Sequence, residues 1–64
     1  MLSQELKLRF VKHTISTLEE MAKEHRENSA YWYKNGFSEL GNYYEGKASA
    51  YEIAVEFLKA DLKD

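Results

Sequence analysis

The stretch Tyr31-Trp32-Tyr33-Lys34-Asn35-Gly36-Phe37-Ser38 decides the fold, because it separates two long segments that both read as helix. Gly36 suits the left-handed residue that follows the end of a helix, where a Cβ atom would clash. Counting back from this glycine predicts a Schellman ending, in which the side chains of Trp32 and Phe37 touch. We therefore expect the only sharp reversal of the chain within residues 35–38.

The segment before the turn predicts an amphipathic helix over residues 4–34, with residues 28–29 as the place for any kink or fraying. Its apolar positions step by three and four residues, which is a heptad repeat on one face. These positions are Leu8, Val11, Ile15, Leu18, Ala22 and His25. A neighbouring stripe holds Phe10, Thr14, Thr17 and Met21. Ser3 is the expected N-cap, and Glu5–Arg9 and Glu19–Lys23 are expected ion pairs within the helix.

The segment after the turn predicts a second helix over residues 39–62, capped by Ser38, with Asn42 and Glu45 as a competing start. It is apolar on more sides than one neighbour can cover. The first stripe is Tyr44, Ala48, Tyr51, Val55, Leu58 and Leu62. The second stripe is Tyr43, Gly46, Ala50, Ile53, Phe57 and Ala60. A helix that is apolar over most of its circumference is a buried helix, so something besides the first helix must cover it.

The length of the chain predicts self-association. A lone pair of helices rarely buries enough apolar surface to offset the conformational entropy of 64 residues, and without a disulfide the remaining remedy is oligomerisation. We therefore expect an all-α fold: one helical-hairpin domain over residues 1–64, antiparallel, that assembles into an oligomeric helical bundle as a homodimer or larger. The predicted oligomer interface is Gly46, Ala50, Ile53, Ala54 and Phe57. Gly46 needs a reason inside a helix, where glycine costs about 1 kcal/mol, and close helix packing supplies one.

Composition excludes several classes of function. The chain is 44% hydrophobic and 31% charged, which disfavours both disorder and a membrane span. Its net charge of −2 disfavours nucleic-acid binding. The start Met1-Leu2-Ser3-Gln4-Glu5 lacks the features of a signal peptide, so we expect a cytoplasmic protein. His13 and His25 face different sides without carboxylates at metal-ligand spacing, and no catalytic motif is present. We expect no enzyme activity, no metal and no cofactor, with His13 solvated and His25 at the edge of the core.

Most of the aromatic residues gather around the turn. Tyr31, Tyr33, Phe37 and Tyr43 are the candidate partner-binding residues, because tyrosine and other rings dominate binding hot spots. Trp32 is left out because its expected contact with Phe37 makes it structural. The competing interpretation is that these rings form the end of the hairpin and part of an oligomer core. A further alternative is nucleotide or nucleic-acid binding by stacking on the rings.

The segment from Tyr43 to Ala54, Tyr-Tyr-Glu-Gly-Lys-Ala-Ser-Ala-Tyr-Glu-Ile-Ala, resembles a pattern in short helical proteins of phages and their Firmicute hosts. There a Tyr-x-x-Gly-Lys-x-x-Ala-Tyr segment opens a C-terminal helix. The resemblance covers about a fifth of the chain and transfers no functional residue. It implies a phage or mobile-element accessory protein that inhibits a host protein by binding to it. A purely structural oligomer subunit is the remaining alternative.

Overall fold

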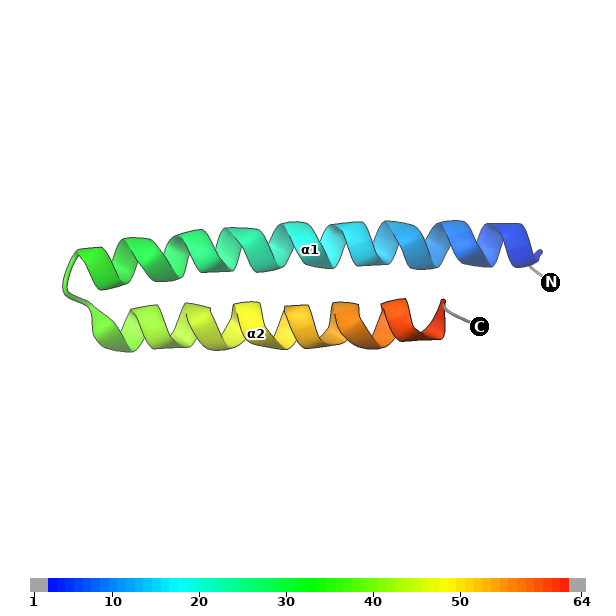
Figure 1. The fold of residues 1–64 in the computed structure, drawn as a ribbon. Helices are drawn as coiled ribbons and strands as arrows, with labels where there is room; N and C mark the ends of the chain where they lie inside the picture. The colour runs from blue at the N-terminus through cyan, green and yellow to red at the C-terminus, as the bar shows by residue number, and fades with distance from the viewer. Residues whose placement is uncertain (1–2, 63–64) are drawn as a thin grey trace.

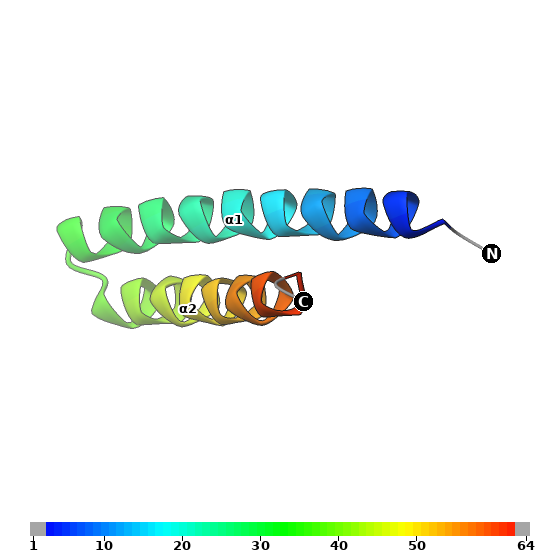
Figure 2. The same cartoon turned by 45° about the vertical axis from the view of Figure 1, so that its right-hand side comes forward.

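The computed structural model describes residues 3–62 and contains two antiparallel helices joined by a tight turn (Figure 1). Helix α1 spans Gln4–Lys34 and helix α2 spans Ser38–Asp61. The two helices lie side by side in both views and form a rod of 50 × 15 × 15 Å (Figures 1 and 2). The predicted helical hairpin is confirmed for these residues, while residues 1–2 and 63–64 of the predicted domain lie outside the described part.

Local signals set the ends of α1 as predicted. The Ser3 hydroxyl accepts a hydrogen bond from the backbone N–H of Leu6 at 3.1 Å, which confirms the N-cap. The helix continues without interruption through residues 28–29, so the fraying considered there does not occur. Glu5 and Arg9 form the expected ion pair at 3.8 Å.

The turn is the predicted Schellman ending. Gly36 has a φ of +84°, in the left-handed region that favours glycine. The Phe37 N–H donates to the Trp32 carbonyl at 2.8 Å, and the Gly36 N–H donates to the Tyr33 carbonyl at 3.1 Å. The rings of Trp32 and Phe37 meet edge to face with centroids 5.5 Å apart, which confirms the expected contact.

The start of α2 differs from the prediction. Ser38 is already helical, and the N-cap is Phe37, which has no side-chain capping bond. The reason is that the turn leads the chain directly into helical geometry, and the Gly41 N–H donates to the Phe37 carbonyl at 3.0 Å. The competing start at Asn42 is wrong because this residue lies inside the helix, where its side chain contacts the Tyr33 hydroxyl.

The seam between the helices follows the predicted heptad pattern. The buried residues are Ile15, Ala22 and Ser29 of α1 and Gly41, Ala48 and Val55 of α2. The half-buried residues beside them include Val11, Leu18, His25, Tyr44, Tyr51, Leu58 and Leu62. The predicted face of α1 therefore packs on the first stripe of α2, except that Leu8 is 45% exposed. The His25 ring stacks between Tyr44 and Tyr51, with centroids 5.9 and 5.4 Å away, at the edge of the core as expected.

This core is thin. Its buried hydrophobic residues are Ile15, Ala22, Ala48 and Val55, and no large side chain among residues 3–62 is fully buried. Within the same residues, neither helix is long and apolar enough to cross a membrane.

Candidate protein-binding surfaces

The rings predicted to bind a partner lie at the turn end of the rod. Tyr31 and Tyr43 are each 57% exposed, and Phe37 is 54% exposed. Each lies edge to face against an aromatic neighbour: Tyr31 and Phe37 against Trp32 with centroids 5.1 and 5.5 Å apart, and Tyr43 against Tyr44 at 5.2 Å. These three rings, together with Tyr33, are called the turn cluster. The cluster presents aromatic area that the hairpin itself does not cover.

Tyr33 differs from the rest of the turn cluster because it joins the two helices. Its hydroxyl lies 2.9 Å from a Glu45 carboxylate oxygen, to which it donates, and also against the side-chain oxygen of Asn42. The hydrogen bond to Glu45, with burial and the nearby negative charge, raises the pKa of Tyr33. Its ring packs so closely on Gly41 that a Cβ atom there would lie 2.7 Å from a ring carbon. Tyr33 thus has a structural task that its position in the sequence did not reveal.

Three polar links cross the seam on one side of the hairpin. Arg26 donates to both carboxylate oxygens of Glu52 at 2.8 and 2.6 Å, and Lys59 lies 3.2 Å from Glu19. The link between Tyr33 and Glu45 continues the series. Successive links are one heptad apart on each helix, so they share one side. We call this side the polar flank, and it consists of Glu19, Arg26, Tyr33, Glu45, Glu52 and Lys59.

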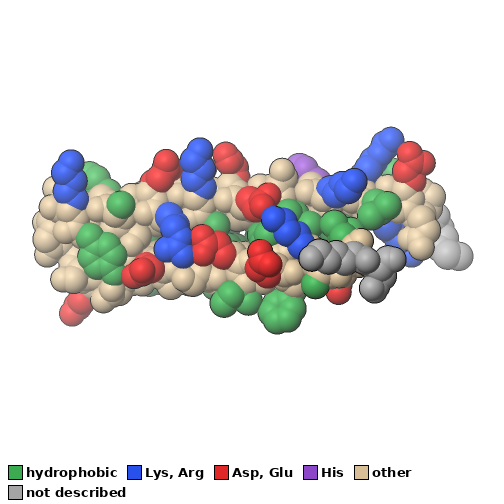
Figure 3. Space-filling view, in the orientation of Figure 1, with side chains coloured by type: hydrophobic (Ala, Val, Ile, Leu, Met, Phe, Trp, Pro, Cys, Tyr) green, Lys and Arg blue, Asp and Glu red, His purple; other side chains and the backbone are tan. Residues whose placement is uncertain are grey.

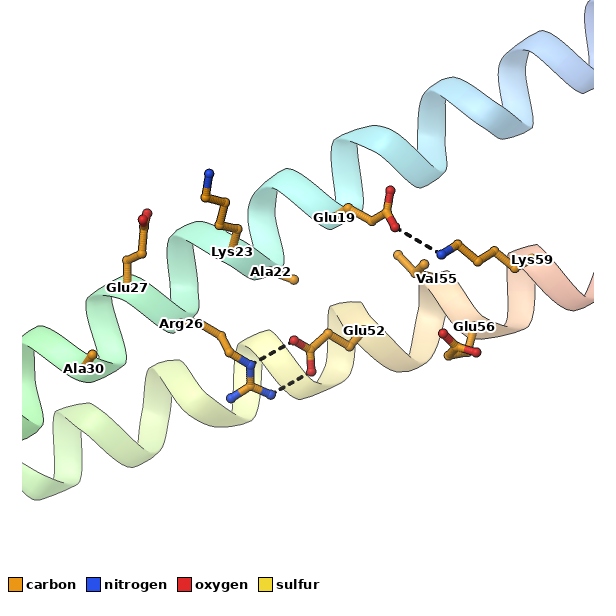
Figure 4. Close-up of a pocket in the computed structure, with 10 residues that line it drawn as sticks. All are labelled: Glu19, Ala22, Lys23, Arg26, Glu27, Ala30, Glu52, Val55, Glu56 and Lys59. Carbon is orange, nitrogen blue, oxygen red and sulfur yellow. Dashed lines mark hydrogen bonds and ion pairs between the residues drawn. The ribbon is translucent and has the colours of Figure 1, made fainter.

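Charged groups dominate the polar flank. Red and blue side chains lie over the seam in Figure 3, and the close-up shows Arg26 and Glu52 reaching across it (Figure 4). The hydrogen bond from Arg26 lowers the pKa of Glu52, and the same contact raises the pKa of Arg26. The predicted pair Glu19–Lys23 is replaced here by a pair across the seam, since Glu19 meets Lys59 instead.

An open groove of about 530 Å³ runs along the polar flank. Its apolar lining is Ala22, Ala30 and Val55, and the charged lining is Glu19, Lys23, Arg26, Glu27, Glu52, Glu56 and Lys59. The groove holds four carboxylates and three basic groups, so it does not concentrate charge of one sign. Two of the basic groups are paired, Arg26 with Glu52 and Lys59 with Glu19. Residues 3–62 hold no group of three histidine or carboxylate side chains that could bind a metal ion.

The second stripe of α2 points away from α1. Ile53 is 57% exposed and Phe57 is 71% exposed, and hydrophobic groups project from the outer edge of α2 in Figure 3. Gly46 and Ala50 are exposed on the same helix, whereas Ala54 is half-buried. A Cβ atom at Gly46 would meet nothing within 4 Å, so the hairpin alone gives this glycine no packing reason. The predicted interface residues thus lie on the surface of the single chain.

Comparisons of the chain with protein-family models, with curated proteins and with solved structures found no match.

Proposed function

We propose that this chain is a small protein-binding module that acts sterically, by occupying or blocking the surface of another protein. The observation that carries the proposal is the exposure of Tyr31, Phe37 and Tyr43 at the turn end of the rod. Rigid rings supply much contact area at a small cost in conformational entropy, which makes them effective in binding surfaces. The resemblance of residues 43–54 to phage-associated helical proteins supports a phage-encoded inhibitor or adaptor that acts on a host protein in the cytoplasm.

The module works as a homo-oligomer, a dimer or larger, in which α2 is central. The thin core and the exposed stripe of α2 support this, because Ile53 and Phe57 leave large apolar side chains in water. Ala50→Glu or Phe57→Glu should dissociate the oligomer, since each would place an unpaired charge in an apolar contact. Sedimentation equilibrium measures this directly, and a folded wild-type monomer of 7.5 kDa would exclude the oligomer.

A second candidate is nucleotide binding at the turn cluster. Lys47 Nζ lies 4.9 Å from the centroid of the Tyr43 ring, which brings a cation beside a ring that could stack on a base. The net charge of −2 weighs against it, so protein binding is preferred. Fluorescence titration with a short single-stranded oligonucleotide separates the two candidates.

The test of partner binding uses Tyr31→Ala and Tyr43→Ala in one chain. Immobilised wild-type protein should retain a specific protein from host lysate, and the double variant should lose it while its oligomer size and Tm stay nearly unchanged. Ser16→Ala, an exposed position far from the turn cluster along the chain, is the control and should keep the partner. Retention by the double variant would move the binding surface elsewhere. A marked fall in Tm would instead assign the rings to the core.

A further inference from the structure

The side opposite the polar flank carries fewer charges than the polar flank. In an antiparallel helix pair, positions on one side of the heptad form one flank and those on the other side form the second. The heptad register that places Arg26 and Glu52 on the polar flank places three small or apolar residues of each helix along the opposite side, with Tyr31 and Tyr43 at the turn end of that side. We call the six small or apolar residues the neutral flank, and they are Thr14, Thr17, Met21, Ala50, Ala54 and Phe57. Among residues 3–62, no hydrogen bond or ion pair joins the two helices on the neutral flank.

We infer that a second copy of this chain covers the neutral flank, an assignment that rests on the self-association proposed above and specifies its face. Both helices then contribute, α1 through its second stripe and α2 through Ala50, Ala54 and Phe57. The result is a four-helix bundle made from two hairpins. Gly46 and Ile53 point straight away from α1 and lie outside this contact.

The surface area that the single hairpin exposes agrees with burial against one further copy. A compact protein of 7.5 kDa exposes about 4,200 Å² of surface, whereas this chain exposes 5178 Å². The excess of about 1,000 Å² is comparable with the ~800 Å² that each partner buries in a standard interface. A second copy on one flank of the rod removes an excess of this size.

The distribution of charge favours the neutral flank over the polar flank as the face that a second copy covers. Covering the polar flank would remove Arg26 and Glu52 from water, and the loss of their hydration opposes such a contact. The same side of the heptad carries Lys7, Glu24, Lys47 and Asp61, two of each sign, so the neutral flank has no net charge that would oppose a second copy. Small side chains at Thr17 and Ala50 also allow two helices to approach closely.

The chain has no cysteine, so the reactivity of a single introduced thiol shows whether an interface covers that position. Ser16 and Thr17 are both exposed in the hairpin but lie on opposite flanks, as do Ala30 and Ala50. We expect the thiols of Thr17→Cys and Ala50→Cys to react with a maleimide roughly tenfold or more slowly than those of Ser16→Cys and Ala30→Cys, because an interface must open before reagent enters.

Sedimentation equilibrium on the same four variants accompanies the labelling. It distinguishes an oligomer that uses another face from a chain that does not self-associate. Oligomeric variants with protected Thr17→Cys and Ala50→Cys support the assignment. An oligomer in which Thr17→Cys reacts as fast as Ser16→Cys overturns the neutral flank and leaves self-association standing. Protection at Ser16→Cys and Ala30→Cys assigns the polar flank instead. A wild-type monomer of 7.5 kDa overturns both proposals.

Discussion

Arg26 meets Glu52 through its Nε and one terminal nitrogen, a two-point contact that lysine cannot reproduce. The lowered pKa of Glu52 makes this contact pH-dependent. A carboxylate with a lowered folded-state pKa stabilises the fold above its unfolded pKa of about 4.3. That stabilisation is lost as the pH falls through the folded-state value. Because both side chains are almost half exposed, solvent screening keeps the effect small.

Glu52→Gln should therefore lower the Tm at neutral pH and have almost no effect near pH 2, where the wild-type carboxylate is protonated as well. Thermal melts of both proteins over this pH range measure the difference. Glu56→Gln changes another carboxylate of the same groove and is the matched control, with a smaller expected change. A Tm difference between wild type and Glu52→Gln that stays constant with pH would contradict the assignment.

Substitution by alanine should change the stability in opposite directions at the two helical glycines of α2. Alanine is better than glycine inside a helix by about 1 kcal/mol. Gly46→Ala should therefore raise stability by about this amount, because its Cβ meets nothing within 4 Å. Gly41→Ala should lower stability, because its Cβ would lie 2.7 Å from the Tyr33 ring. Urea unfolding of both variants tests this pair. A destabilising Gly46→Ala would place another helix against this glycine and count against the neutral flank as the covered face.

The turn between the elements depends on one backbone conformation. Gly36 has a φ of +84°, which costs a residue with a Cβ atom about 1–2 kcal/mol. Gly36→Ala should thus lower the Tm by several degrees, while Gly36→Asn should lower it less, since asparagine tolerates this region. The two variants are compared by circular dichroism melts. Equal Tm values for wild type and Gly36→Ala would show that the turn carries no such strain.

For the two helices and the turn, the sequence predicts the features that depend on neighbouring residues and misses the side-chain contacts between α1 and α2. Ser3 and Gly36 act on their own neighbours, so the ends of α1 follow from spacing alone. The start of α2 at Ser38 was missed because Phe37 caps it without a side-chain bond. The links of Glu19 to Lys59 and of Tyr33 to Glu45 depend on the register between the helices, which no single-helix pattern fixes.

The buried hydrogen bond of Ser29 is another feature that sequence reasoning overlooked. Its hydroxyl donates to the Gly41 carbonyl at 2.8 Å, and both residues occupy seam positions where an apolar side chain is usual. A small polar residue beside a glycine lets the helices approach at the turn end. The signal was available, because Ser29 and Gly41 continue the heptad series of Ile15, Ala22 and of Ala48, Val55.

For the molecule as a whole, the partner-binding residues remain predictions, because exposure alone does not identify what covers a ring. Tyr31, Phe37 and Tyr43 are accessible in the hairpin, and so are Ile53 and Phe57. Tyr43 shares a stripe of α2 with Ile53 and Phe57, so the two groups are separated by their distance along the rod and not by their side of it. Substitutions at the turn should affect binding to another protein, whereas substitutions along the helices should affect assembly and stability.

The stability of the whole molecule should therefore depend on protein concentration. A chain that is folded mainly as an oligomer gains stability by mass action, so its Tm rises as concentration rises. Phe57→Glu should lower the Tm and abolish this dependence, although Phe57 is 71% exposed in the single hairpin and its loss would leave an isolated hairpin almost unaffected. Ala30→Glu on the polar flank is the control and should keep the wild-type dependence. Calorimetric scans over a wide range of protein concentrations measure this dependence. A wild-type Tm that stays constant with concentration would show that the thin core of one hairpin is enough to stabilise the fold without oligomerisation.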